Sequence, residues 1–333
     1  MVIHMNKQPL DFDLENEKNL SDILMSLEDW VARNGGIIQE VRVDDIHVSL
    51  ENETHDLEKD VSSISKIEVF TASKEQHAIE TVYTLNEYVR TFLNDYLSTE
   101  GTEAYDSIME GMRLILEGTE EIVNVLGIND LFVLDDKKKS LRKILGELAA
   151  LVERYEKKYF DKEGRDTLEA YMRELPLLFP KLIKWGVVKN LDKFPMIQPD
   201  KKALYFTEIA GDYYTILTEA VELFERIAEN LQLGKDAEAL GDIYYITEIL
   251  DEYIVLLRTV QESFEVDLEK LGTDDKKLED LFRKITGRLK EVSEALKQGD
   301  MISVGDVLEY ETKPLFERLV ELLGEIKDFS FFC

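Results

Sequence analysis

The chain has little cysteine, proline and long apolar sequence, and each shortage excludes a class of protein. Its single cysteine is Cys333, so it has no internal disulfide, and one thiol cannot build a structural zinc site. Only 6 prolines and 17 glycines occur in 333 residues, which is few for an all-β protein and common in long helices. No apolar run approaches the roughly 18 residues of a membrane-spanning helix. The first residues also lack the basic start and apolar stretch of a secretory signal. These features predict a cytoplasmic protein without a membrane span, of plain bacterial composition.

The residues of familiar catalytic sites are also missing from most of the chain. All four histidines, at positions 4, 47, 55 and 77, lie in its first quarter. This excludes Ser-His and Cys-His nucleophile pairs, and the Glu-x-x-His pairs of di-iron bundles, from the remainder. Phosphate-binding loops, dinucleotide fingerprints and nucleophile elbows are absent as well. The sequence therefore predicts a protein that is not an enzyme and has no catalytic, cofactor-binding or metal site.

Negative charge, by contrast, is abundant. The chain holds 70 acidic and 40 basic residues, for a net charge of −30. Its short lysine runs all lie beside aspartate or glutamate, so they do not form the basic clusters that nucleic acids require. Acidity of this size promotes solubility, and it also favours a basic partner. We expect a basic or amphipathic protein as the partner, and no nucleic acid.

The helical part of the sequence contains an internal duplication. Residues Leu141–Gly146 recur as Phe282–Gly287, and the Asp-Asp-Lys-Lys stretch at 135–138 recurs at 274–277. Further matches occur in the same chain order at offsets of 138 to 141: Leu168-Glu169 with Leu308-Glu309, Pro176-Leu177 with Pro314-Leu315, and Gly186 with Gly324. One order and nearly one offset indicate two tandem copies of a helical unit.

Residues 1–74 have a different pattern. Apolar residues alternate over Val2–Leu14, with Gln8-Pro9 expected at a hairpin turn, and a 3.6-residue period follows from Leu20 to Val31. Gly35-Gly36 should end that helix, and strands should follow on both sides of a turn at Asp44-Asp45, with a last strand over residues 64–70. This order resembles the β-grasp, or ubiquitin-like, fold. The resemblance implies a docking module rather than a conjugated protein, because the Gly-Gly pair is internal.

The fold class predicted is mainly α, with a small β-grasp-like α+β domain followed by two duplicated helical bundles. The domains are expected at residues 1–74, 75–190 and 201–333. Each copy should hold four helices joined by short loops. Pro176 and Pro180 should kink or divide the last helix of the first copy, because proline removes a backbone donor.

Gly-Asp pairs recur inside the helices of the second copy. We expect close helix packing at these glycines, with the aspartate accepting a backbone or tyrosine hydrogen bond. Alternatively, the neighbouring tyrosines line a groove for a partner, together with the apolar tail. The candidate partner-binding residues are Asp212, Tyr213, Tyr214, Asp242, Tyr244, Tyr245, Asp306, Tyr310, Phe331 and Phe332.

Three functions are compatible with these features. The leading hypothesis is a non-enzymatic adaptor, scaffold or chaperone, whose duplicated acidic surface binds its protein partner at two related sites. The second is a small-ligand binder or enzyme with a carboxylate or tyrosine site between the copies, for which Glu169 and Glu309 are matched acids. The third and weaker hypothesis is an acidic mimic of nucleic acid.

Overall fold

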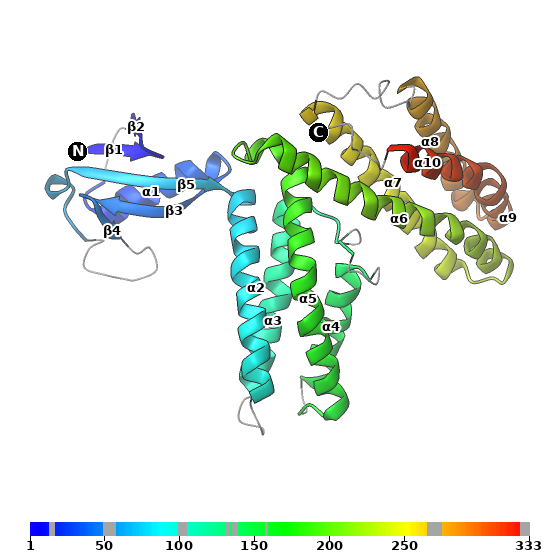
Figure 1. The fold of residues 1–333 in the computed structure, drawn as a ribbon, viewed down its shortest axis with the longest axis horizontal. Helices are drawn as coiled ribbons and strands as arrows, with labels where there is room; N and C mark the ends of the chain where they lie inside the picture. Colours follow the sequence, from blue (N-terminus) through cyan, green and yellow to red (C-terminus); the bar gives the residue numbers. More distant parts are fainter. Residues whose placement is uncertain are drawn as a thin grey trace. The chain divides into compact units, whose positions relative to one another are not determined.

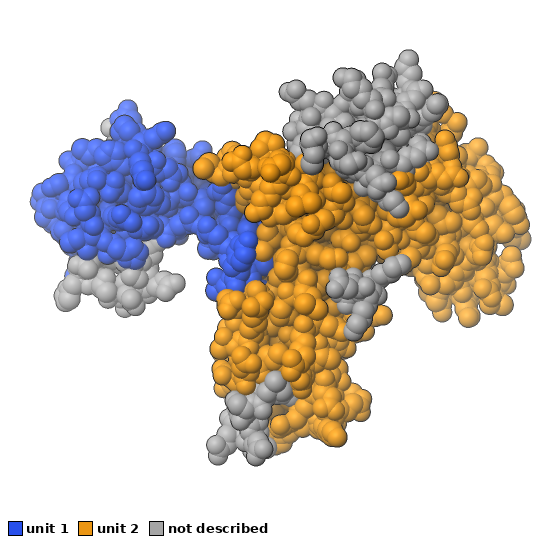
Figure 2. Space-filling view, viewed as in Figure 1, with its two compact units in different colours: residues 1–85 blue, residues 86–333 orange. Residues whose placement is uncertain are grey.

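The protein is described by a computed structural model over residues 1–12, 17–48, 58–98, 105–130, 133–134, 139–156, 159–264 and 275–326. It divides into two compact units, Met1–Leu85 and Asn86–Cys333 (Figure 2). It is mainly helical, with one small five-stranded sheet, which confirms the predicted fold class. The helices that follow residue 98, from both copies, belong to the second unit, so the predicted domain boundary between the two copies stays a prediction.

The first unit contains a mixed sheet in the order β2-β1-β5-β3-β4. Strand β1 pairs in parallel with β5, and the other strand pairs are antiparallel. The strands are β1 Val2–Met5, β2 Gln8–Leu10, β3 Gly36–Val43, β4 Ile46–Val48 and β5 Lys66–Ser73. The chain order of a first hairpin, a helix, a second strand pair and a last strand is the one that the sequence pattern predicted, and the structure places that last strand in the centre of the sheet.

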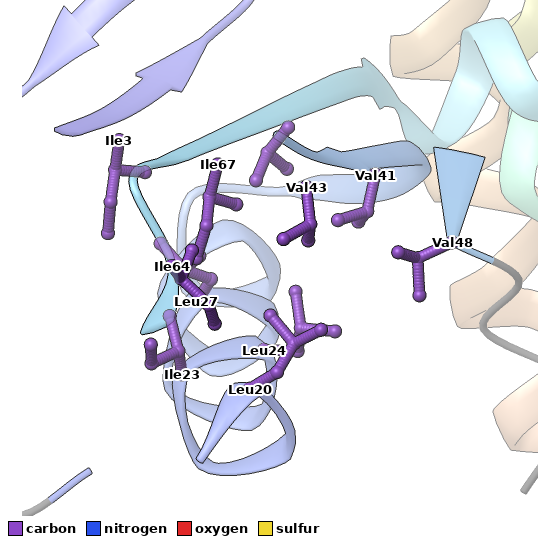
Figure 3. Packing of buried hydrophobic residues seen from close by; sticks show 11 residues of the cluster. Ile3, Leu20, Ile23, Leu24, Leu27, Val41, Val43, Val48, Ile64 and Ile67 are labelled. Atoms are coloured by element: carbon purple, nitrogen blue, oxygen red, sulfur yellow. The ribbon is translucent and has the colours of Figure 1, made fainter. Parts of the chain in front are cut away.

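Helix α1, Leu20–Arg33, covers one face of this sheet (Figure 3). Asn19 caps the helix by accepting from the Asp22 amide, and the Asp22 carboxylate accepts from the Asn19 amide in return. The apolar period places Leu20, Ile23, Leu24 and Leu27 against the sheet, where they are buried with Val41, Val43, Ile67 and Val69. Each such side chain contributes about 1.5–3 kcal/mol by leaving water.

The first hairpin turns two residues earlier than predicted. Asn6 and Lys7 form the turn, with φ values of 50° and 68°, whereas Pro9 lies within β2 opposite His4. The left-handed conformation matches the twist of paired strands, and asparagine tolerates it. The Asn6 side chain also accepts from the Thr71 amide at 2.9 Å. Proline is compatible with β2 because β2 is an edge strand. The predicted turn at Asp44-Asp45 is confirmed by φ values of 50° and 68°.

The helices of the two copies follow one another in matching order. The first copy contains α2 Lys74–Ser98, α3 Tyr105–Leu126, α4 Leu141–Tyr155 and α5 Lys162–Lys189. The second contains α6 Pro199–Gln232, α7 Asp236–Phe264, α8 Asp275–Gln298, and then α9 Met301–Asp306, a π-helical segment Val307–Thr312 and α10 Lys313–Ile326. Within the second unit α3, α4 and α5 pack side by side, and α6 packs on α7, α9 and α10 (Figure 1).

Helix ends in the second copy follow the predicted chemistry. Gly234 and Gly299 end α6 and α8 with φ values of 69° and 71°, a conformation that glycine adopts without strain. Asp300 then caps α9 by accepting from the Ser303 amide at 3.0 Å. Two glycines and one aspartate therefore set the corners of this copy.

The last helix differs between the copies. Helix α5 runs unbroken through Pro176 and Pro180, so these prolines do not divide it, and a kink there stays a prediction. The second copy has two fewer residues between Leu308 and Pro314 than the first has between Leu168 and Pro176. Its π-helical turn also takes up about one residue more than an α-turn. The helical path between the two matched positions is therefore shorter by the equivalent of about three α-helical residues, close to one full turn. The buried faces therefore stay in register.

Candidate functional site

The two copies share a core of aromatic side chains. Trp185 of α5 contacts Tyr213 of α6 with a ring-centroid distance of 5.2 Å, and Tyr213 contacts Tyr253 of α7 at 5.9 Å. All three are at most 1% exposed, and Tyr253 continues to Phe282 of α8 at 5.7 Å. Tyr213 was predicted on a partner-binding surface. It is a core residue instead, because it lies on the face of α6 that meets α5 and α7.

Ion pairs also connect the two copies. Glu248 and Glu252 lie one turn apart on α7 and face cations of the first copy. Lys189 Nζ lies 2.5 Å from Glu252, with only 12% and 18% of the two side chains exposed, and also donates to the Gly127 carbonyl at 3.1 Å. Arg142 of α4 lies 3.2 Å from Glu248. Breaking the buried Lys189–Glu252 pair would leave an uncompensated charge, so this pair favours one arrangement of the copies.

Burial shifts the pKa of the phenols at this interface. It raises the pKa of Tyr253 far above the ordinary range, and the Tyr253 hydroxyl has no hydrogen-bond partner among the described residues. Burial also raises the pKa of Tyr213, and the nearby Glu252 carboxylate adds to that shift. Both phenols are therefore neutral at physiological pH.

Most of the predicted aspartates and tyrosines of the second copy are engaged within the protein. Asp212 lies 3.4 Å from Lys181 of α5, and burial raises the pKa of its carboxyl group. Asp242 accepts from Arg226 Nε at 2.8 Å, which ties α7 to α6. The expected hydrogen bonds from backbone or tyrosine groups are replaced by ion pairs at both positions.

Tyr214 and Tyr245 are half-buried. Tyr214 packs on Gly324 of α10, where a Cβ atom would come within 3.3 Å of its ring. Burial raises the pKa of Tyr245, with Glu219 and Glu248 adding to the shift. These two rings join helices of the second unit and offer little surface to a partner.

Two predicted tyrosines do lie at the surface. Tyr244 is 74% exposed and Tyr310 is 67% exposed, and Asp306 is exposed on the helix that leads to Tyr310. Glu309 and Asp306 both raise the pKa of the Tyr310 phenol by their negative charge. Phe331 and Phe332 lie outside the described residues. The eight described residues of the predicted set are thus spread over core, interface and surface, and do not form one groove.

Close backbone packing occurs at glycines other than those predicted. A Cβ atom at Gly211 or Gly241 would meet no heavy atom within 4 Å, so the expected helix contacts there were wrong. At Gly305 it would lie 3.8 Å from Leu231 of α6, an ordinary van der Waals contact. At Gly111 and Gly164 it would come within 2.5 Å of the rings of Phe92 and Tyr155. The Gly-Asp pairs recur in the sequence, but that recurrence does not indicate where helices pack closely. At Gly111 and Gly164 the close packing comes from an aromatic ring that faces the glycine.

A cleft that sequence reasoning missed lies between Lys139, which precedes α4, and the first half of α5. Its volume is about 660 Å³. The lining residues are Lys139, Lys162, Glu163, Asp166, Thr167, Ala170, Tyr171 and Glu174. Seven of them recur on α5 at spacings of three or four residues, so one face of that helix forms the wall. Carboxylates outnumber ammonium groups in this lining by three to two.

Lys139 shows how this wall holds a cation. Its Nζ lies 2.8 Å from Glu147, 3.1 Å from Glu174 and 4.7 Å from the Tyr171 ring centroid. Burial by itself would lower the pKa of Lys139, but the two carboxylates outweigh it and hold the pKa above its usual value. The cleft thus contains a cation site built from two acids and an aromatic face.

No helix among the described residues is long and apolar enough to cross a membrane. The same residues contain no group of three or more histidine, cysteine or acidic side chains that could hold a metal ion.

Comparison with known proteins relates separate parts of the chain to different families. Residues 1–73 match the family model described as the TP0873 N-terminal domain, and residues 208–322 match a domain of unknown function, DUF8042. An uncharacterized protein of Treponema pallidum (strain Nichols) is 28% identical over 189 residues, which are 55% of this chain and 87% of that relative. No solved structure matches the chain. The chain is therefore similar at its N-terminal unit to one family and within its second helical copy to another.

Proposed function

We propose that the protein is a non-enzymatic interaction scaffold of the cytoplasm, and that its duplicated acidic helices bind a basic or amphipathic protein partner. The observation that carries this proposal is the shared interface of Trp185, Tyr213 and Tyr253 with the Lys189–Glu252 pair. A fixed connection sets the spacing between two related surfaces. A partner that contacts both then gains from a raised effective concentration.

The exposed surface supports the same proposal. The net charge of −30 attracts a basic partner at low ionic strength, and Tyr244 and Tyr310 offer exposed aromatic rings beside acidic residues. Tyrosine is enriched at protein interfaces because it combines apolar area with a hydroxyl group.

The proposal is tested by affinity capture of the tagged full-length protein from its native cells at low and at high salt, with mass spectrometry of the retained proteins. We expect a basic protein that is retained at low salt and released at high salt, because salt screens exposed charges. Absence of a retained protein at both salt concentrations would contradict the scaffold proposal.

A small-ligand site between the copies is the second candidate. The buried Tyr253 hydroxyl, which has no hydrogen-bond partner among the described residues, favours it, because a ligand could satisfy that group. The Lys189–Glu252 pair opposes it, since the carboxylate whose charge acts on the neighbouring Tyr213 is already neutralised. A metabolite screen by thermal shift, comparing the wild type with Tyr253→Phe, separates the two candidates. A compound that stabilises only the wild type would favour the ligand site.

A further inference from the structure

We propose that two molecules of this protein bind each other through helix α8 of one and helix α3 of the other. The contact joins a basic stripe on α8 to an acidic stripe on α3, with the two helices antiparallel. Both helices belong to the second unit. This inference goes beyond the proposed scaffold function, because the contact requires no other protein.

The basic stripe lies on the outward face of α8. This helix has seven basic and five acidic residues, whereas the whole chain has a net charge of −30. Arg283, Gly287 and Lys290 are exposed and follow one another at spacings of four and three residues, so they share one face. The Arg283 side chain is 80% exposed and pairs with Asp280 of its own helix, which also pairs with Lys284. One carboxylate thus serves two cations, and no ion pair in the described part of the chain involves Lys290.

The acidic stripe lies on the outward face of α3. Glu110, Leu114 and Glu117 are exposed at the same spacings of four and three residues. Among the described residues, neither glutamate takes part in an ion pair. Seven residues span about 10 Å along a helix, so these glutamates are as far apart as the two cations of α8. In an antiparallel pair, Glu117 therefore meets Arg283 where Glu110 meets Lys290.

Gly287 leaves room for the leucine between the two glutamates. A Cβ atom at Gly287 would meet no heavy atom within 4 Å, and the same holds at Gly146, its aligned residue on α4. Glycine is disfavoured inside helices, so its presence at one exposed position in both copies indicates a use outside the fold of each copy. The missing side chain forms a gap on α8, and Leu114 is 53% exposed and projects from α3. A ridge on one helix packs into such a gap on another.

The chain already contains this kind of contact between its own copies. Arg142, which the duplication aligns with Arg283, belongs to the third helix of the first copy. It lies 3.2 Å from Glu248 on α7, the second helix of the second copy. The third helix of one copy therefore binds the second helix of the other through an arginine and a carboxylate.

The corresponding surface on α3 is exposed. At an offset of 134, four buried residues of α3 match four buried residues of α7, namely Met109, Met112, Ile115 and Leu116 with Ile243, Ile246, Ile249 and Leu250. The same offset aligns Leu114 with Glu248, and Glu110 and Glu117 lie on either side of Leu114. The contact between α8 and α3 thus repeats, between molecules, the contact that α4 and α7 make within one. A heterologous interface repeats in this way when both of its surfaces occur on each molecule.

The experiment is sedimentation velocity of the purified full-length protein from micromolar to submillimolar concentration. Salt at about 150 mM screens the long-range repulsion between two acidic molecules. The α8 variant is Arg283→Glu with Lys290→Glu, and the α3 variant is Glu110→Lys with Glu117→Lys. Each variant is measured alone and in an equimolar mixture with the other. Circular dichroism and the thermal midpoint confirm that each variant is folded.

We expect the wild type to self-associate and each variant alone to associate at least about tenfold more weakly, because like charges then face each other. The mixture should associate again, since the acidic α8 of one variant meets the basic α3 of the other. The control is Arg90→Glu with Arg318→Glu, which makes the same charge change as the α8 variant at exposed positions on α2 and α10. It should weaken association less than about twofold, because charges outside the contact are screened.

The α3 variant separates the contact from a general effect of charge. It makes the molecule less acidic, which by itself would favour association, so stronger association of this variant would overturn the proposal. A wild type that stays monomeric at every concentration, a mixture that associates no better than its components, or an equal loss in the control would also overturn it. The scaffold function would stand in each case, since capture of a partner tests it separately.

Discussion

The two helical copies keep the same buried positions but connect their helices with different chemistry. Gly164, Leu168 and Met172 of the first copy are buried, and so are Val304, Leu308 and Thr312 at a constant offset of 140. The apolar face of this helix has thus been retained, whereas its length and its polar contacts have not. This contrast teaches that the core defines the fold of each copy, and that the contacts outside the core distinguish one copy from the other.

The copies also differ in their share of the common interface. The first copy supplies the cations Arg142 and Lys189, and the second supplies the carboxylates Glu248 and Glu252. An interface with opposite charges on its two sides favours one arrangement of the copies over others. The four predictions below test this division of roles, from the largest expected effect to the smallest.

The largest effect is expected from Trp185→Ala. Trp185 belongs to the first copy but packs in the core that it shares with the second, and it is fully buried. Its removal should lower the free energy of unfolding by about 3–5 kcal/mol, through lost burial and a cavity. Denaturant titration measures the change. Trp30→Ala on α1, where the side chain is 41% exposed, is the control and should change stability by less than about 1 kcal/mol.

Lys189→Met should destabilise the protein by about 3 kcal/mol, because Glu252 is left as a buried charge without its partner. Adding Glu252→Leu should restore much of the loss, since the charge is then removed as well. Arg142→Met breaks a more exposed pair and should have an effect of about 1 kcal/mol or less. Equal losses for Lys189→Met and Arg142→Met would show that burial does not distinguish the two pairs.

Gly164→Ala should cost about 1–3 kcal/mol, although the aligned residue of the second copy is the larger Val304. A Cβ atom at position 164 meets the Tyr155 ring, whose hydroxyl is held by Asp161 at 2.5 Å. Gly211→Ala, which meets nothing within 4 Å in the middle of α6, should instead stabilise the protein by about 0.5–1 kcal/mol. Thermal unfolding of both variants checks the opposite signs.

The smallest effect is expected from Tyr253→Phe. The ring contacts with Tyr213 and Phe282 remain, while a buried hydroxyl group without a hydrogen-bond partner in the described part of the chain is removed. Stability should rise by about 1 kcal/mol. A clear loss of stability in denaturant titration would mean that this hydroxyl has a partner in solution.

Local patterns predicted much of this fold. Period-3.6 and period-2 patterns predicted the helix from Leu20 and the strands around it, and the repeated motifs predicted helices in matching order. The first hairpin was misplaced because Pro9 was taken for a turn residue, although an edge strand also accepts proline. Turn position here depends on the conformation of Asn6 and on its bond to Thr71, which lies 65 residues away.

The sites were harder to predict because they depend on which helix faces meet. Tyr213 and Tyr214 are adjacent in the sequence, yet one is in the interface core and the other packs on Gly324. The cleft combines Lys139 with Tyr171 and Glu174, which come from separate elements. The sequence did contain a signal for it, since the repeated motifs align Glu147 of the first copy with Arg288 of the second, and Tyr171 with Glu311. Only the structure shows that these positions are in contact.

The shared interface is tested most directly by hydrogen–deuterium exchange of the full-length protein and of Lys189→Met, followed in α4 and α8 at several low denaturant concentrations. Neither helix contains Lys189, and the two helices belong to different copies. If the copies form one rigid scaffold, the substitution lowers protection in both helices by a similar free energy. Loss of protection in α4 alone, with α8 unchanged, would contradict the coupling of the copies.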